Sequence, residues 1–297
     1  IKVIDPKVGE TVYDGAVGSA GFLVEAFEHM RQSKTLTTSE LKTLQTKSFY
    51  GAEKKTLAYI IGIMNMILHG IESPNIIHQN TLETNIQEIQ NKDRVDVILA
   101  NPPFGGREKI NIQENFPIKT SQTAYLFLQH FIKKLKIGGR CGIVIINTFL
   151  TNTDSGSIAL RKQLLEECNL FAILDLPTGT FTGTGVKTVA IFFEKGKPTK
   201  ELWYYQLNTG RNLGKTNSLN EDDLEDFIKS TKIKKISKNS WSIDIKKIDK
   251  NTWDLSVQNP NIAEEIDERT PKEIILEIEK LDKQSSVSIK KINDLLK

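Results

Sequence analysis

The clearest chemical signal in this sequence is a tetrad that directly follows an apolar segment. Residues 95–100 are mostly apolar and lead straight into Asn101-Pro102-Pro103-Phe104. Because proline lacks an amide hydrogen, the two prolines end the predicted strand in a rigid loop. The Asn101 side-chain oxygen and the Pro102 carbonyl would form a fixed pair of hydrogen-bond acceptors. Phe104 would stack on the face of the group that they hold.

A fixed pair of acceptors suits one kind of reaction. The nitrogen of a nucleobase amine or of an amide is a poor nucleophile, because its lone pair is delocalised into the neighbouring π system. Accepting both hydrogens of that nitrogen directs its lone pair toward a methyl donor. The tetrad therefore predicts methyl transfer to such a nitrogen, and a base inside a duplex would have to be flipped out to reach the site.

A second set of candidate residues forms a glycine-rich loop after the first predicted strand. Gly15, Gly18 and Gly21 are three residues apart, and the strand ends at Asp14. The spacing is not the Gly-x-Gly-x-x-Gly of dinucleotide enzymes, and the Asp14 carboxylate would repel a diphosphate. The loop favours a ligand with a positive amino group, such as S-adenosylmethionine, and Glu53 would accept hydrogen bonds from its ribose. The alternative is a glycine-rich turn beside a carboxylate that stabilises a helix start.

Apolar segments alternate with helical patterns over the first 200 residues. Strands separated by helices form a mostly parallel sheet with helices on both faces, and ligands bind such sheets beyond the carboxyl ends of the strands. The sequence therefore predicts an α/β fold whose functional residues lie in the loops after the strands. The predicted strands are residues 11–14, 48–51, 75–78, 95–100, 141–146, 171–176 and 187–194, and the predicted helices are residues 20–31, 54–69, 123–135 and 157–167.

The chain changes in character after about residue 200. Residues 202–207 predict a further strand, and the lysine-rich stretch 229–250 is either a contact surface for phosphates or a solvated face. Thr270-Pro271-Lys272-Glu273 is a capping box that begins an amphipathic helix, and Gln284-Ser285-Ser286 is expected to interrupt it. Its apolar stripe comprises Ile274, Ile275, Ile278 and Leu281, then Ile289, Ile292, Leu295 and Leu296.

The composition excludes several classes of protein. No apolar run approaches the ~18 to 20 residues that a membrane helix needs. The two cysteines, Cys141 and Cys168, are too few for a disulfide framework or a four-thiolate zinc site, and the cytoplasm is the expected location. The four histidines lack cysteine partners and short ligand spacing, so no metal is expected. A net charge of +3 leaves a nucleic-acid partner open, because a basic face can be hidden in a nearly neutral total.

Together these motifs resemble those of the modification (M) subunit of type I restriction-modification systems, an S-adenosylmethionine-dependent DNA adenine-N6 methyltransferase. The likeness extends from Asp5 to about Pro260 and includes the glycine loop and the tetrad. Further matching motifs are Gly21-Phe22-Leu23-Val24-Glu25-Ala26, Asn65-Met66-Ile67-Leu68-His69-Gly70-Ile71, Asn80-Thr81-Leu82, Leu176-Pro177-Thr178-Gly179-Thr180-Phe181 and Lys187-Thr188.

The resemblance implies a Rossmann-like methyltransferase fold with a mostly parallel seven-stranded sheet, helices on both faces and a C-terminal helical segment. It implies that Glu53 holds the cofactor ribose and that Asn80 and Thr81 lie near the cofactor adenine. The tetrad would be the catalytic loop, and Phe104 with Phe181 would form the target-base pocket. The residues implied around the methionine part of the cofactor are Asp14, Gly18, Ser19, Ala20, Gly21 and Phe22.

The resemblance also implies partners and domains. The substrate would be double-stranded DNA, and the partners would be a specificity (S) subunit, a second M subunit and a restriction (R) subunit. Residues 1–200 would form the catalytic domain, 201–262 its extension, and 263–297 a helical segment for subunit docking or for packing on its own domain. The amino-terminal helical domain of the family is expected to be absent from this sequence.

Two other kinds of function stay open. The same tetrad serves methyltransferases that act on a protein glutamine amide or on RNA guanine, so the chemistry at Asn101 cannot separate these targets from adenine. A noncatalytic assembly subunit could keep the fold without a working pocket. The long similarity outside the tetrad favours adenine in DNA.

Overall fold

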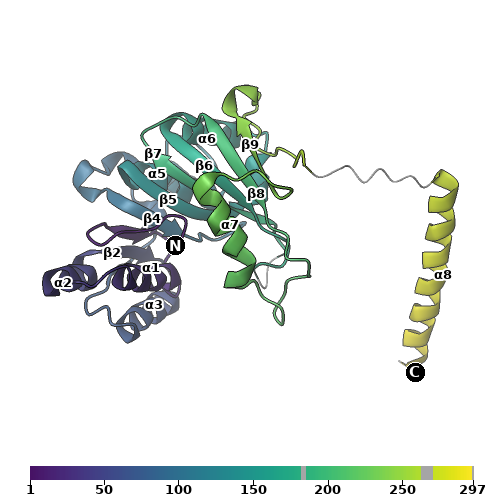
Figure 1. Cartoon of the computed structure of the whole chain (residues 1–297), viewed down its shortest axis with the longest axis horizontal. Helices are drawn as coiled ribbons and strands as arrows, with labels where there is room; N and C mark the ends of the chain where they lie inside the picture. Colours follow the sequence, from purple (N-terminus) through teal and green to yellow (C-terminus); the bar gives the residue numbers. More distant parts are fainter. Residues whose placement is uncertain (182–184, 262–269, 296–297) are drawn as a thin grey trace. The chain divides into compact units, whose positions relative to one another are not determined.

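The fold is that of a computed structural model, in which residues 1–181, 185–261 and 270–295 are described (Figure 1). The chain divides into two compact units, Ile1–Asn261 and Ile262–Lys297. The first unit contains the sheet, and the second contains the long helix α8 (Pro271–Leu295). Among the described helices, none is both long enough and apolar enough to cross a membrane.

The first unit is built on one mixed sheet. Its strand order is β3-β2-β1-β4-β5-β7-β6-β8-β9, and neighbouring strands are parallel except in the pairs β5–β7, β6–β7 and β8–β9. The α/β class and the mostly parallel sheet are confirmed, but the described residues form nine strands instead of the seven expected. The strands are β1 (Val12–Asp14), β2 (Phe49–Glu53), β3 (Asn75–His78), β4 (Val95–Ala100), β5 (Leu135–Ile146), β6 (Cys168–Asp175), β7 (Thr188–Lys195), β8 (Glu201–Gln206) and β9 (Ser240–Asp244).

Helices cover both faces of this sheet. Successive side chains of a strand point to opposite faces, and apolar side chains on both faces have to be buried. Val12 and Val97 pack in one apolar cluster with α1, whereas their neighbours Tyr13 and Ile98 pack in another with α5 and α6. The helices of the first unit are α1 (Gly21–Gln32), α2 (Thr38–Lys47), α3 (Thr56–Leu68), α4 (Ile110–Gln113), α5 (Thr123–Lys134), α6 (Ser155–Glu167) and α7 (Glu221–Ile233), with short 3-10 helices η1 (Thr81–Glu83), η2 (Ile86–Glu88), η3 (Asn91–Asp93), η4 (Asn147–Leu150) and η5 (Ile245–Lys247).

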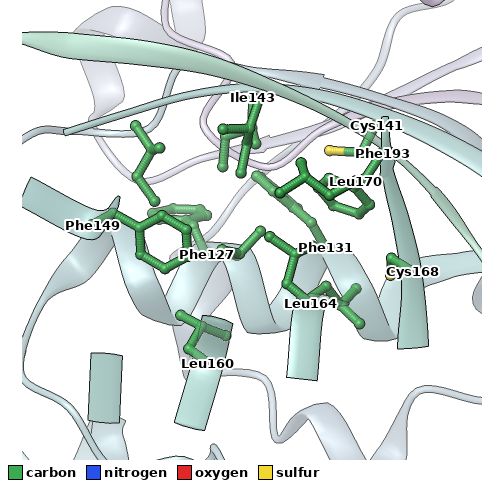
Figure 2. Close-up of a cluster of buried hydrophobic side chains, with 14 of the residues drawn as sticks. Phe127, Phe131, Cys141, Ile143, Phe149, Leu160, Leu164, Cys168, Leu170 and Phe193 are labelled. Carbon is green, nitrogen blue, oxygen red and sulfur yellow. The ribbon is translucent and has the colours of Figure 1, made fainter. Parts of the chain in front are cut away.

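The larger core lies between the sheet and the helix pair α5 and α6. Figure 2 shows Phe131 of α5 and Leu164 of α6 beside side chains that come from the strands. Cys141 and Cys168 are buried free thiols in the same cluster. On the opposite face, α7 packs Phe227 against the aromatic side chains of β8. These cores hold the strands whose carboxyl ends carry the candidate site.

Two helices differ from what their sequences suggest. α3 buries Gly62 and Met66 and leaves a stripe of large apolar side chains exposed. This orientation arises because Gly62 packs closely against the glycine loop. α8 continues through Gln284-Ser285-Ser286, so the predicted interruption is wrong. Serine and glutamine cost a helix interior only about 0.5 kcal/mol each, which a long helix tolerates. Leu296 of the predicted stripe lies outside the described residues, as does the side chain of Leu295.

Candidate active site

The strands that lead to the predicted site residues are neighbours in the sheet. β1 pairs in parallel with β2 on one side and with β4 on the other. Parallel strands end at the same edge, so the loops that follow these three strands meet there. Asp14 and Glu53 are the last residues of β1 and β2, and Asn101 directly follows β4.

The glycine loop is held in an uncommon backbone conformation. Gly18 has a φ of 54°, and Ala20, directly before α1, has a φ of 63°. Because alanine in the left-handed region costs on the order of 1 kcal/mol, the surrounding structure has to hold it there. Asn65 of α3 does so in part by donating a hydrogen bond from Nδ2 to the Ser19 carbonyl over 2.8 Å. Strain of this kind is concentrated at ligand sites.

A cavity of about 420 Å³ opens against this loop, which is within the usual range for small-molecule sites. It brings Asn101 of the tetrad to the same wall as the glycine loop. Four residues predicted to bind the cofactor do not line it, namely Ala20, Glu53, Asn80 and Thr81. The other predicted residues that do not line it are Pro102, Pro103, Phe104 and Phe181. The predicted residues on its wall are Asp14, Gly18, Ser19, Gly21, Phe22 and Asn101.

Sequence reasoning missed four residues of this wall. Ile1, Ala16, Val17 and Glu25 also line the cavity. Glu25 could have been found, because it follows Phe22 by three residues and residues three apart share one side of a helix. The side chains of Ile1, Ala16 and Val17 have no reactive group, so their types gave no signal.

Asp14 is the buried acid of the cavity. Its side chain is 1% exposed, and its Oδ1 accepts the Ala16 N–H over 2.8 Å. Burial raises the pKa of Asp14 to about 7, the Ala16 hydrogen bond opposes this shift, and the Glu53 charge adds to it. A carboxylate that is costly to ionise alone is strongly stabilised by a cation beside it. Asp14 therefore suits a ligand that carries a positive amino group.

Glu53 holds the loop from behind. Its Oε2 accepts the Gly18 N–H over 2.9 Å, and its Oε1 accepts the Lys55 N–H over 2.8 Å. Each carboxylate oxygen keeps a second lone pair, which leaves capacity for a ribose hydroxyl. The contact in this structure fixes the conformation of Gly18, a role that the sequence analysis did not foresee.

Asn80 and Thr81 lie after β3. Thr81, the first residue of η1, is buried and donates from Oγ1 to the Gly15 carbonyl over 2.6 Å, so it touches the glycine loop from the segment after a third strand. Asn80 caps η1, because its Oδ1 accepts the Leu82 N–H over 3.2 Å. The two residues are thus beside the loop but not on the cavity wall.

The tetrad presents an acceptor that lacks a donor. Asn101 Oδ1 is buried, and no group among the described residues donates a hydrogen bond to it. Such a buried acceptor costs about 1–3 kcal/mol, which a bound donor would offset. Pro102 is buried and Pro103 is exposed, so the chain turns outward directly after the candidate acceptor pair.

Phe104 and Phe181 come together at this edge. Their ring centroids are 5.6 Å apart and their planes are inclined by 58°. Phe181 comes from the loop after β6, and residues 182–184 of that loop lie outside the described residues. The two rings supply apolar faces next to the tetrad.

The residues present fit S-adenosylmethionine. The cavity wall combines two carboxylates, Asp14 and Glu25, with the bare backbone of the glycine loop. Acidic groups favour the amino group and the sulfonium, and the bare backbone admits the methionine chain at short range. The unpartnered Asn101 Oδ1 stands on the same wall, where a methyl acceptor would have to approach.

This strand order, with a ligand cavity at the carboxyl ends of β1 and β4, defines a Rossmann-like methyltransferase fold. The model of the N-6 DNA Methylase family matches residues 1–269. The chain belongs to this family.

Individual relatives agree with the family. The methylase subunit of the Escherichia coli type I restriction enzyme EcoEI is 45% identical over 207 residues, which are 68% of this chain and 41% of that subunit. A solved structure on complex assembly and conformational transition of the type I R-M system has a TM-score of 0.81 at 36% identity and covers 99% of this chain and 63% of its own. The crystal structure of the EcoKI M protein has a TM-score of 0.70 at 30% identity and covers 77% of this chain and 50% of its own. The chain thus spans less than half of the curated EcoEI subunit.

Proposed function

We propose that this chain methylates the N6 amine of a flipped adenine in double-stranded DNA as the modification subunit of a type I restriction-modification system. The observation that carries this proposal is the buried, unpartnered Oδ1 of Asn101 on the cavity wall that also contains Asp14. Membership of the family and the names of the relatives, which are methylase subunits of type I restriction enzymes, support the same function.

Each site residue has a defined task in this proposal. Bound S-adenosylmethionine supplies an electrophilic methyl group on a sulfonium. Asp14 attracts the positive amino group of the cofactor, and the loop from Gly18 to Phe22 packs along its methionine part. Glu53 holds the ribose, with Asn80 and Thr81 toward the adenine of the cofactor.

The tetrad and the two phenylalanines act on the target base. Asn101 Oδ1 and the Pro102 carbonyl accept the two hydrogens of the amine, so that its lone pair points at the methyl group. Pro103 keeps the loop rigid, and Phe104 and Phe181 stack on the flipped base. The amine proton leaves to solvent after the nitrogen becomes cationic, so no general base is needed.

The proposal includes partners, domains and location. Residues 1–200 are the catalytic domain, 201–262 its extension, and 263–297 the segment that docks on the specificity subunit. A second modification subunit and a restriction subunit complete the assembly. We place the protein in the cytoplasm, since its two buried free thiols suit a reducing compartment.

Replacement of Asn101 by alanine tests the function. Loss of one preorganised acceptor should lower kcat at least about a hundredfold and leave cofactor affinity within about twofold. Methylation-sensitive sequencing of DNA from cells that express the chain with its specificity subunit identifies the methylated motif. The kcat is then measured from the rate of methyl transfer to DNA that carries this motif, and affinity by calorimetry with S-adenosylmethionine. The control is Asn251→Ala, an exposed asparagine far along the chain. Full adenine methylation by Asn101→Ala would falsify the assignment, and wild-type DNA without a modified adenine motif would refute the function.

A further inference from the structure

The loop between the tetrad and α5 is closed at its neck. Thr123, the first residue of α5, donates its backbone N–H to the Gly106 carbonyl over 3.0 Å and its Oγ1 hydrogen to Glu108 Oε1 over 3.1 Å. The Glu108 N–H in turn donates to the Ser121 carbonyl over 2.8 Å. Because β4 ends and α5 begins at the same sheet edge, this neck lies beside the tetrad and begins two residues after Phe104.

The neck is tight and the loop body is anchored. A Cβ placed on Gly106 would lie 2.6 Å from Thr123 Oγ1, so no larger residue fits there without a shift. Ile112 and Phe116 are buried in the cluster that contains α5, and the Gln113 amide donates from Nε2 to the Glu108 carbonyl over 2.9 Å. The loop is therefore a rigid extension of the catalytic edge.

The outer side of this loop combines one apolar side chain with two cations. Ile110 is 75% exposed, although Ile112 two positions later is buried, because residues two apart lie on nearly opposite sides of α4. Arg107 and Lys109 are exposed, and neither forms an ion pair with another described residue. This combination suits a DNA duplex from which one base has been flipped out. The exposed isoleucine fits the apolar gap in the base stack, and the two unpaired cations fit the phosphates beside it.

We propose that Ile110 inserts into the DNA stack at the space left by the flipped adenine, while Arg107 and Lys109 contact the flanking phosphates. This inference rests on the proposed function and adds the element that opens the duplex. Apolar side chains inserted between base steps offset the cost of unstacking, and lysine and arginine at phosphates hold the wedge in position. The anchored neck keeps the wedge at a fixed position relative to Phe104.

The test compares two duplexes that carry the sequence methylated by the wild-type chain. In one duplex the target adenine pairs with thymine, and in the other it faces an abasic site, where flipping costs little. Ile110→Ala, assembled with the specificity subunit, should lose about tenfold in kcat/KM on the paired duplex and less than about threefold on the abasic duplex. Ile110→Leu should restore the paired duplex to within about twofold.

Ile137→Ala is the matched control. Ile137 is also an isoleucine and is 70% exposed, but it lies near the start of β5, at the opposite edge of the sheet. This variant should match the wild type on both duplexes. Equal losses of kcat/KM by Ile110→Ala on both duplexes, or no loss on either, would overturn the insertion of Ile110. Wild-type activity in the same experiment would still uphold the proposed adenine methylation. A wild-type chain that methylates neither duplex would overturn both.

Discussion

Asp14 couples the binding site to pH. Burial raises the pKa of Asp14 to about 7, so the folded protein binds its proton more tightly than an unfolded chain, whose aspartate titrates near 3.8. The free energy of unfolding therefore falls as pH rises from about 4 to 7, and Asp14 lowers it no further above pH 7. Asp14→Asn should remove this pH dependence. Above pH 7 its free energy of unfolding should exceed that of the wild type by up to about 4 kcal/mol, as measured by denaturant unfolding at several pH values.

Asp96 is the control with the opposite sign. Burial would raise the pKa of Asp96, but hydrogen bonds from Lys136 and Thr11 hold it below its ordinary value. Its stabilising contribution is present above the unfolded pKa and is lost as pH falls, so Asp96→Asn should destabilise the protein at pH 7. If the free energies of unfolding of Asp14→Asn and the wild type change in parallel from pH 4 to 8, ionisation of the buried Asp14 does not destabilise the folded protein.

The residues of the site were predictable where their types carry chemistry. The tetrad identified Asn101, and the strand end identified Asp14; the structure places both on one cavity wall. The contact between Glu53 and the Gly18 N–H joins residues 35 positions apart, so only the folded sheet reveals it. The pairing of Phe104 with Phe181 was foreseen through the family resemblance and not from spacing, since nothing local connects the two loops.

The element that joins the carboxyl-terminal part of the first unit to its core is α6, through Arg161. Its guanidinium is fully buried and donates to the carbonyls of Phe149, Asn152, Thr252 and Trp253 over 2.7 to 2.8 Å. Arg161→Ala would leave four carbonyls without this donor, so it should lower the free energy of unfolding by about 3–5 kcal/mol in urea denaturation.

Two further variants separate this role from a general effect of charge. Arg161→Lys should recover only part of the loss, because one ammonium cannot reach four carbonyls in the geometry of a guanidinium. Arg31→Ala removes a half-exposed arginine that pairs with Glu28 and should change stability by less than about 1 kcal/mol. Equal stability of Arg161→Ala and the wild type would show that α6 does not hold these loops.

Elements were predictable where apolar periodicity is undisturbed, as in β3 and β4. β9 was missed because Trp241 and Ile243 alternate with serines inside the lysine-rich stretch, whose charge hides the period of two. α7 carries a capping box from Asn220 to Asp223 that the sequence analysis overlooked. β5 begins at Leu135, well before its predicted start. The prediction missed the first half of this strand because Gly138 and Gly139 interrupt its apolar pattern.

At the scale of the whole molecule, the second unit does not bury the apolar stripe of α8 among its own described residues. The side chains of α8 described in the second unit are exposed, including the stripe residues Ile274, Ile275, Ile278 and Leu281. An amphipathic helix gains most of its stability by packing its apolar face, so a helix of 25 residues with an open stripe is expected to associate. Our proposed partner is the specificity subunit.

Charges placed in the stripe test this assignment. Ile278→Asp combined with Leu281→Asp removes two apolar contacts worth about 1.5–3 kcal/mol each and adds charges that would be buried, so affinity for the specificity subunit should fall at least about a hundredfold. Gln284→Asp adds one negative charge, where the double variant adds two, on the polar side of the helix, and it should leave binding unchanged. Titration by calorimetry measures both. The first unit contains its own cores and the candidate cofactor cavity, so S-adenosylmethionine affinity should stay at the wild-type value in every variant. Unaltered subunit binding by the double variant would mean that another surface holds the assembly together.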